Sequence, residues 1–184
     1  MSALTILGLV LPFPLAFILH DAEEIAVQHR WMLSHKETLV KRYPRLKPMI
    51  DHLSYLDTKA FAVAALEELA VLALATAYVL MQGRYAVELW SALFMAFSIH
   101  LLVHIGQAIW VRGYVPGITT SLLLLPFAAY GVWSIWLSMS GMEMLMWGTT
   151  GLLVMVINLR FAHWLGHKVG KWLDHSNTDL PHRE

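Results

Sequence analysis

Long apolar segments alternate with short polar links along most of this chain. Five segments exceed the roughly 20 mainly apolar residues that an α-helix needs to cross a bilayer. They predict membrane-spanning helices at about residues 4–28, 58–81, 85–111, 117–140 and 144–172. The links around Gly83 and Gly113 are short, so we expect consecutive helices to pack as antiparallel neighbours. The predicted fold is an all-α, polytopic membrane bundle.

Two polar stretches complete this plan. Residues 29–57 are predicted to form a cytoplasmic loop, with one or two interfacial helices interrupted at Pro44. Residues 174–184 read as a polar tail, so residues 1–173 are expected to form a single transmembrane domain. The composition agrees, because 58% of the residues are hydrophobic and only 14% are charged. An average soluble domain is about 25% charged.

Lysine and arginine residues gather on one side of the predicted membrane. That side holds Arg30, Lys36, Lys41, Arg42, Arg45, Lys47, Lys59, Arg112, Lys168, Lys171 and Arg183. Arg84 alone lies on the other side, and Arg160 lies inside the last span. Because positive loops stay in the cytoplasm, the N-terminus is predicted outside and the C-terminus inside. We expect an integral protein of the bacterial cytoplasmic membrane.

The sequence His20-Asp-Ala-Glu23-Glu24 lies near the end of the first span, where ionisable residues are costly. A carboxylate in hydrocarbon costs several kcal/mol, so such residues usually mark a functional site (about 2.5–3.5 kcal/mol on insertion scales). At spacing i, i+3 and i+4 the side chains of His20, Glu23 and Glu24 share one helical face. A histidine and two carboxylates on one face are suited to binding a metal.

Other ionisable residues occur in three further spans. They are Glu67, Glu68, His100, His104, Arg160 and His163. With the predicted orientation, all of them fall toward the cytoplasmic half of the membrane, at the depth of the motif. The two histidines of the third span are four residues apart and share a face. The adjacent glutamates of the second span point about 100° apart, so we expect only one to face the centre.

Imidazoles and carboxylates together form the ligand set of zinc, iron or manganese. The chain has no cysteine, which excludes thiolate metal sites, iron–sulfur clusters and a cysteine nucleophile. We expect one or two divalent ions, zinc or iron. The predicted ligands are His20, Glu23, His100, His104 and His163. The predicted catalytic residues are Glu24, Glu67, Glu68 and Arg160: a glutamate would complete the metal shell or act as general base, and the arginine would hold an anionic group.

The motif at His20–Glu24 resembles the signature of the HxxEE-domain family of small bacterial and archaeal membrane proteins. The stretches His104-Ile-Gly-Gln107 and Tyr114-Val-Pro-Gly-Ile-Thr119 are also similar to that family. The family has no assigned function. The resemblance implies that His20, Glu23 and Glu24 are functional residues, and it implies no particular substrate.

These features favour a metal-dependent membrane enzyme that acts on a lipid or another amphiphile. Zinc would indicate a hydrolase, and iron would indicate an oxidoreductase such as an oxygenase or desaturase. The same residues are also compatible with a salt-bridged polar core without metal, a transporter or proton or ion relay, or a bis-histidine haem protein. Nucleic acid is not an expected partner, because the net charge is +0 and no basic patch interleaves with aromatic residues.

The charge asymmetry generates a topology prediction. A reporter that works only in the cytoplasm should be active when it is fused after Glu184, and inactive when it is fused in the link at Gly83. Periplasmic activity of the fusion after Glu184 would contradict the number of spans or their orientation.

Overall fold

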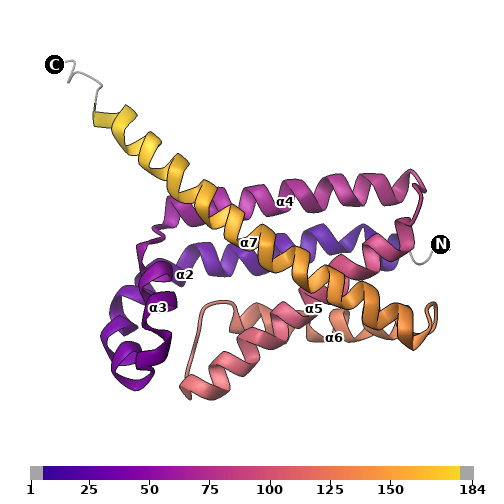
Figure 1. Ribbon diagram of the computed structural model, residues 1–184, viewed down its shortest axis with the longest axis horizontal. Helices are drawn as coiled ribbons and strands as arrows, with labels where there is room; N and C mark the ends of the chain where they lie inside the picture. The colour runs from indigo at the N-terminus through magenta and orange to yellow at the C-terminus, as the bar shows by residue number, and fades with distance from the viewer. Residues whose placement is uncertain (1–5, 179–184) are drawn as a thin grey trace.

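The computed structural model describes residues 6–178, with side-chain surroundings for residues 8–172, and this part of the chain is helical without strands. The elements are the π-helical turn η1 (Ile6–Val10), α2 (Pro12–Arg42), the 3-10 turn η2 (Pro44–Leu46), α3 (Lys47–Tyr55), α4 (Thr58–Leu80), α5 (Ala86–Val111), α6 (Ile118–Trp136) and α7 (Gly141–Thr178). Figure 1 shows α2 and α4 running alongside each other, with α7 crossing the molecule diagonally.

Four of these helices are long and apolar enough to cross a membrane: α4, α5, α6 and the part Gly141–Trp172 of α7. The predicted first span lies largely in α2, which carries three acidic residues, Asp21, Glu23 and Glu24, within its apolar part. Those acidic residues make α2 less apolar than the other four helices. The prediction of an all-α, polytopic membrane bundle is confirmed, and five spans are broadly consistent with it.

The ends of α2 differ from the sequence prediction. The sequence predicts Pro12 and Pro14 as kinks inside the first span. They lie instead in the first turn of α2, where a missing backbone N–H costs nothing, so they begin the helix. At the other end, α2 continues without a break to Arg42, through residues predicted as a loop with one or two interfacial helices interrupted at Pro44. No proline or glycine interrupts the chain between Pro14 and Pro44, and a proline disfavours helical backbone in the residue before it.

The C-terminal helix also runs further than predicted. Residues 174–178 of the expected tail continue α7, and residues 179–184 lie outside the described residues. In contrast, α6 ends at Trp136, a few residues before the predicted end of the fourth span. The helix boundaries were therefore less predictable than the helices themselves.

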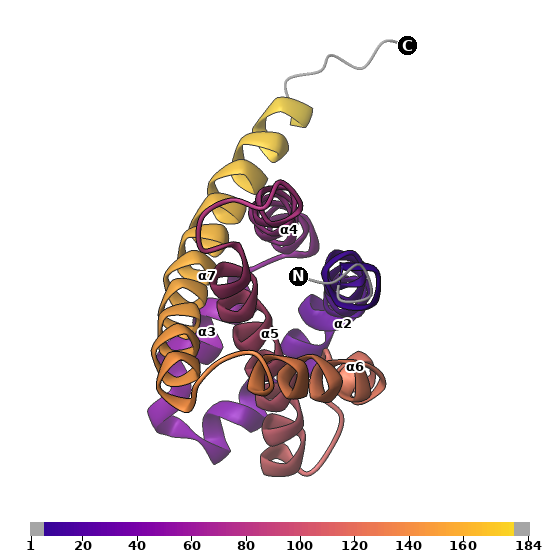
Figure 2. The ribbon, with the colours of Figure 1, turned by 90° about the vertical axis from the view of Figure 1, so that its right-hand side faces the viewer.

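Helix α5 is the centre of the bundle. Figure 2 shows it surrounded by α2, α4, α6 and α7. In the apolar window of α5, 56% of the residues are buried inside the protein, against 6% for α7. The fully buried Phe94 of α5 contacts Phe13 of α2 edge to face, with ring centroids 5.1 Å apart. The ring centroid of Phe97, one turn further along α5, lies 5.3 Å from that of Phe13. The polar residues His100 and His104 follow this aromatic group along α5.

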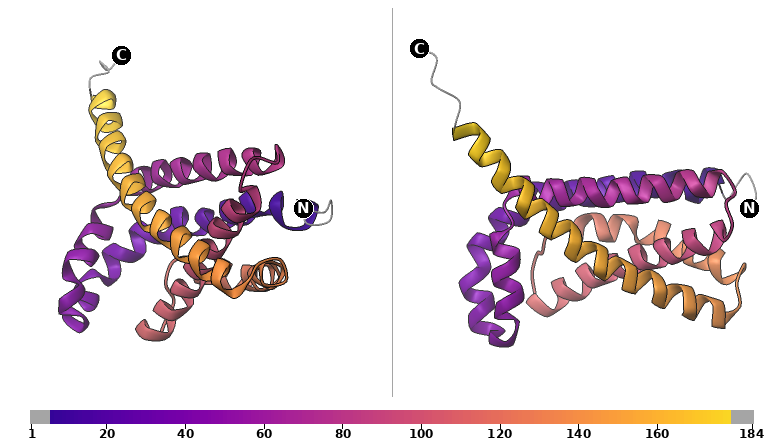
Figure 3. Two further views of the ribbon diagram at one scale, coloured as in Figure 1. Left: turned by 45° about the vertical axis from the view of Figure 1, so that its right-hand side comes forward. Right: turned by 45° about the horizontal axis from the view of Figure 1, so that its top comes forward.

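The last part of α2 packs beside α3 at one end of the molecule (Figure 3). Lys36 of α2 forms an ion pair with Asp51 of α3, at 3.0 Å between Nζ and Oδ1. Beyond α2, the hydroxyl of Tyr43 donates to the carbonyl oxygen of Trp110 at 3.0 Å. That bond satisfies one of the carbonyl groups left free at the end of α5. The end of α2 and α3 thus form an ordered pair of helices, and Tyr43 joins this pair to the end of α5.

Glycines allow α7 to lie against the backbones of its neighbours. A Cβ atom at Gly151 would overlap the carbonyl oxygen of Ala92 in α5. A Cβ atom at Gly166 would overlap the carbonyl oxygen of Ala60 in α4. Helices in membranes associate largely through close packing of this kind, because the surrounding lipid is as apolar as the side chains.

Gly151→Ala and Gly166→Ala should therefore each destabilise the bundle, by about 1–3 kcal/mol, as overpacking does. The measurement is thermal unfolding of the purified protein in a neutral detergent. Gly106→Ala is the matched control, because a Cβ atom at this exposed helical position would meet nothing within 4 Å. The control should unfold at the same temperature as the original chain or slightly higher. Equal behaviour of the three variants would contradict the close approach of α7.

Candidate metal centre

Four residues from two helices form a compact group, which we call the His–Glu cluster: His20 and Glu24 of α2, and His100 and His104 of α5. Each offers one ligand atom, and these atoms all lie within 4.8 Å of one another. His20 is completely buried, and His104 and Glu24 are nearly so. The spacing i, i+4 within each helix brings both pairs of side chains to the same side, and the packing of α2 beside α5 brings the pairs together.

The distances in the His–Glu cluster suit a metal ion at its centre. The Nε2 atoms of His100 and His104 are 3.0 Å apart, and the Glu24 carboxylate lies 3.5 Å from His104 Nε2. The same carboxylate lies 3.8 Å from His20 Nε2 and 3.9 Å from His100 Nε2. Tetrahedral zinc with bonds of about 2.0–2.1 Å separates its ligand atoms by about 3.3–3.4 Å. The distance between the two histidine nitrogens is shorter than this value, and the three distances to the Glu24 carboxylate are longer.

His20 presents an unused nitrogen to this centre. Its Nδ1 lies 3.0 Å from Thr120 Oγ1, while the buried Nε2 has no hydrogen-bond partner in the described structure. The Thr120 hydroxyl donates to the Glu23 carboxylate at 2.7 Å and accepts from His20. The hydrogen-bond network therefore places the proton of His20 on Nδ1 and leaves a lone pair on Nε2. Histidines that bind metals are oriented in this way.

Glu23 faces away from the His–Glu cluster, toward the start of α6. Its carboxylate accepts hydrogen bonds from the backbone N–H groups of Thr120 at 2.7 Å and Thr119 at 3.3 Å, and from the Tyr114 hydroxyl at 2.8 Å. A helix N-terminus is favourable for a carboxylate, because its first N–H groups lack partners within the helix. Burial and the bond to Glu23 raise the pKa of Tyr114 to about 12, so its hydroxyl remains a donor.

Gly117 closes the turn over the His–Glu cluster. Its φ of +82° lies in the left-handed region that glycine adopts readily. A Cβ atom there would lie 2.8 Å from Nδ1 of His104 and 3.0 Å from Cε1 of His20. The turn before α6 therefore packs directly against two imidazole rings, which only a residue without a side chain permits.

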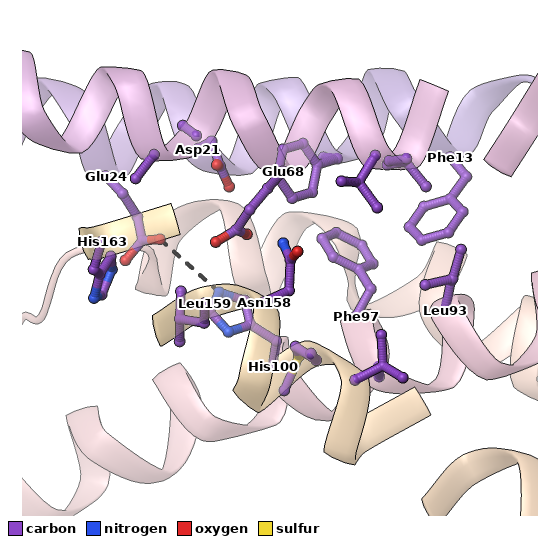
Figure 4. Close-up of a pocket in the computed structure, with 18 of the residues that line it drawn as sticks. Phe13, Asp21, Glu24, Glu68, Leu93, Phe97, His100, Asn158, Leu159 and His163 are labelled. Carbon is purple, nitrogen blue, oxygen red and sulfur yellow. Dashed lines mark ion pairs between the residues drawn. The ribbon is translucent and has the colours of Figure 1, made fainter. Parts of the chain in front are cut away.

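A cavity of about 120 Å³ adjoins the His–Glu cluster, between α2, α4, α5 and α7. Figure 4 shows polar side chains at one end, including Glu24, Glu68 and His163, and apolar side chains such as Phe13 and Leu93 at the other. A single water molecule needs a cavity of only about 10–15 Å³. The cavity therefore has room for part of a larger molecule next to the four potential ligands.

The structure distributes the other predicted site residues around this cavity. Glu68 lines it, whereas Glu67 accepts a hydrogen bond from Asn158 at 3.1 Å. His163 also lines the cavity, but lies outside the His–Glu cluster, with its Nδ1 atom 3.4 Å from Nε2 of His52. Arg160 lies on the exposed side of α7 and does not line the cavity. Of the five predicted ligands, the structure brings together His20, His100 and His104.

Two residues at the site, Asp21 and Thr120, were not predicted from the sequence, and the part of a third, Asn158, was left open. Asp21 lies within the motif, but its helical position suggested a different face. It lines the cavity together with Glu24. Asn158 precedes Arg160 by two residues and carries no charge to draw attention. Thr120 follows the Tyr114–Thr119 stretch directly, and its role depends on where α6 begins relative to α2. Only the turn at Gly117, before a polar helix start, could have pointed to it.

Comparison with known proteins supports the motif. A family model described as "Protein of unknown function with HXXEE motif" matches residues 11–131. The match extends from the start of α2 into α6, so it includes the whole His–Glu cluster and Thr120 and excludes α7. No curated protein and no solved structure matches the chain. The resemblance inferred from the motif is confirmed.

The buried bonds of Thr120 generate a prediction. Thr120→Val keeps the shape of the side chain but leaves His20 Nδ1 without its partner and removes a donor from Glu23. The variant should lose about 1–3 kcal/mol of stability, as expected for unsatisfied buried polar groups. Thermal unfolding measures the loss. Thr150→Val is the control, because Thr150 is exposed on α7 and its hydroxyl donates to the carbonyl oxygen of Met146 in its own helix. Similar unfolding temperatures for both variants would contradict the role of the Thr120 hydroxyl.

Proposed function

The chain belongs to the family of HXXEE proteins, whose function is unknown. We propose that it is an integral membrane enzyme that depends on a divalent metal. Its substrate is a lipid or another amphiphile, and its location is the cytoplasmic membrane of a bacterium. The observation that carries the proposal is the His–Glu cluster beside a cavity with one polar and one apolar end.

His20, Glu24, His100 and His104 would hold the metal. Three imidazoles and one carboxylate are suitable ligands for zinc and for iron. The buried, unpartnered Nε2 atom of His20 supports this assignment, because a buried nitrogen without a partner is otherwise costly. Glu23 would act as a positioning residue, which holds His20 through Thr120 and anchors α6 to α2.

The metal would supply Lewis acidity for hydrolysis in the case of zinc, or redox chemistry for oxidation in the case of iron. Glu68 would be available to accept a proton, because it lines the cavity without belonging to the His–Glu cluster. Glu67 would support it indirectly by holding Asn158, whose side chain also lines the cavity. Arg160 has no role in this arrangement, because it lies on the exposed side of α7.

The cavity supports an amphiphilic substrate. Its apolar end is lined by residues such as Phe13, Leu72 and Leu93, which would accept an alkyl chain. Its polar end adjoins the His–Glu cluster through Glu24 and His100, which belong to both. A molecule with an alkyl chain in the apolar end would thus bring its polar group to the proposed metal.

A proton or ion relay is the second candidate. The 3.0 Å separation between the Nε2 atoms of His100 and His104 also suits a direct hydrogen bond between two imidazoles. Such a chain of histidines and carboxylates could transfer protons without any metal. The metal content of the purified protein separates the two functions.

We expect protein purified in detergent without chelator to contain stoichiometric zinc or iron, measured by elemental mass spectrometry. Glu24→Gln should lose most of the metal, because it removes a ligand and the charge that balances the cation. Glu23→Gln should weaken metal binding by about 10- to 100-fold, the usual effect of disturbing a residue that orients a ligand. Asp21→Asn should retain the metal, since Asp21 lies outside the His–Glu cluster.

Two results would contradict this assignment. Absence of any stoichiometric zinc, iron or manganese in the unaltered protein would favour the relay. Equal loss of metal from Glu23→Gln and Glu24→Gln would place both carboxylates on the metal, as the sequence alone suggested.

A further inference from the structure

Asp21 is a buried carboxylate that the proposed metal site does not use. Only 9% of its surface is exposed, and it lines the cavity between α2, α4, α5 and α7. Within the described residues, it accepts no hydrogen bond and forms no ion pair. Buried carboxylates are normally paired or hydrogen-bonded, because water otherwise solvates them much better. Asp21 therefore lacks the partner that such a group requires.

The surroundings of Asp21 add negative charge instead of neutralising it. The carboxylates of Glu24 and Glu68 line the same cavity as Asp21. No lysine or arginine occurs among the described residues that line the cavity. A metal in the His–Glu cluster would be balanced first by Glu24, which is one of its ligands. Asp21 and Glu68 would remain as two further carboxylates at the polar end of the cavity, together with Asn158 and His163.

Aromatic side chains also line the cavity. Phe17, Phe61 and Phe97 line the same cavity, with no hydroxyl among them. The faces of aromatic rings attract organic cations, and pockets that recognise quaternary ammonium groups combine them with carboxylates. A small hydrated metal ion gains little from such walls, whereas an alkylammonium group can contact both the rings and the carboxylates.

From this arrangement we infer that the polar end of the cavity is a binding site for the ammonium group of a cationic amphiphile, an alkylamine or a quaternary alkylammonium. Asp21 and Glu68 pair with the positive group, and the alkyl chain occupies the end near Phe13 and Leu93. The inference rests on the proposed function in one respect: it names the class of amphiphile that occupies the cavity beside the proposed metal.

The geometry favours an organic cation over a second metal ion. Neither Asp21 nor Glu68 belongs to a described group of three or more ligand atoms within 4.8 Å of one another. Asn158 and His163 line the same end, but His163 is paired with His52, and Asn158 with Glu67. A second metal would need more converging ligands than this end of the cavity supplies. An ammonium group needs only charge and contact.

The test measures, by calorimetry, how tightly short alkyl probes bind to the full-length, metal-loaded protein in a neutral detergent. Octyltrimethylammonium and octylamine should bind at least about tenfold more tightly than octanol, since charge-assisted contacts contribute roughly this much. Octanoate should bind most weakly. Asp21→Asn and Glu68→Gln should each weaken binding of the ammonium probes by about 10- to 100-fold. Glu88→Gln is the matched control, on the first turn of α5 outside the cavity, and should bind them unchanged.

Metal content measured on the same samples separates this inference from the proposed function. Ammonium binding that depends on Asp21 in a protein without metal would support the cation site and contradict the metal enzyme. Octanol or octanoate binding as tightly as the ammonium probes would overturn the cation site. So would unchanged ammonium binding in Asp21→Asn, or loss of metal from that variant, which would assign Asp21 to the metal instead. Loss of the ammonium probes with retention of metal is the expected result.

Discussion

The carboxylate of Glu23, held by the first N–H groups of α6, is the contact on which the arrangement of the site depends. It joins α2 to the start of α6, and through Thr120 it also orients the His20 ring. A charged group in an apolar bundle is stable only with several donors, and a helix N-terminus supplies them together. The turn before α6, with Gly117 packed against two imidazoles, is thereby placed over the His–Glu cluster.

The HxxEE motif thus contains residues with different surroundings. One helical face is wide enough for His20 and Glu24 to point at α5 while Glu23 points at α6. Adjacent positions on a helix differ by about 100°, so neighbouring glutamates necessarily meet different partners. The same geometry turns Asp21 toward the cavity. The residues of this five-residue segment have different partners because three neighbouring helices, α4, α5 and α6, lie around α2.

Close packing around α5 determines where the cavity beside the His–Glu cluster lies. The aromatic contacts of Phe13 and Phe94 fill the bundle on one side of the cluster, and glycines let α7 approach the backbones of α4 and α5. Close packing on these sides leaves the remaining space between the helices as a cavity with one polar and one apolar end. This division explains why we assign a metal to the His–Glu cluster and a cationic amphiphile to the space beside it.

The sequence alone predicted the membrane-spanning helices and singled out His20, because hydropathy and helical spacing are local properties. It also indicated His100 and His104 as partners, since their spacing puts both on one face. It named Glu23 as a ligand and Glu24 as a catalytic residue, whereas the structure places Glu24 in the His–Glu cluster. Both glutamates lie within one helical face, and only the positions of α5 and α6 distinguish them. The roles of Thr120 and Asp21 likewise required the tertiary structure. A threonine that links two residues about a hundred positions upstream, and a carboxylate that faces a cavity formed by four helices, leave no local pattern in the chain.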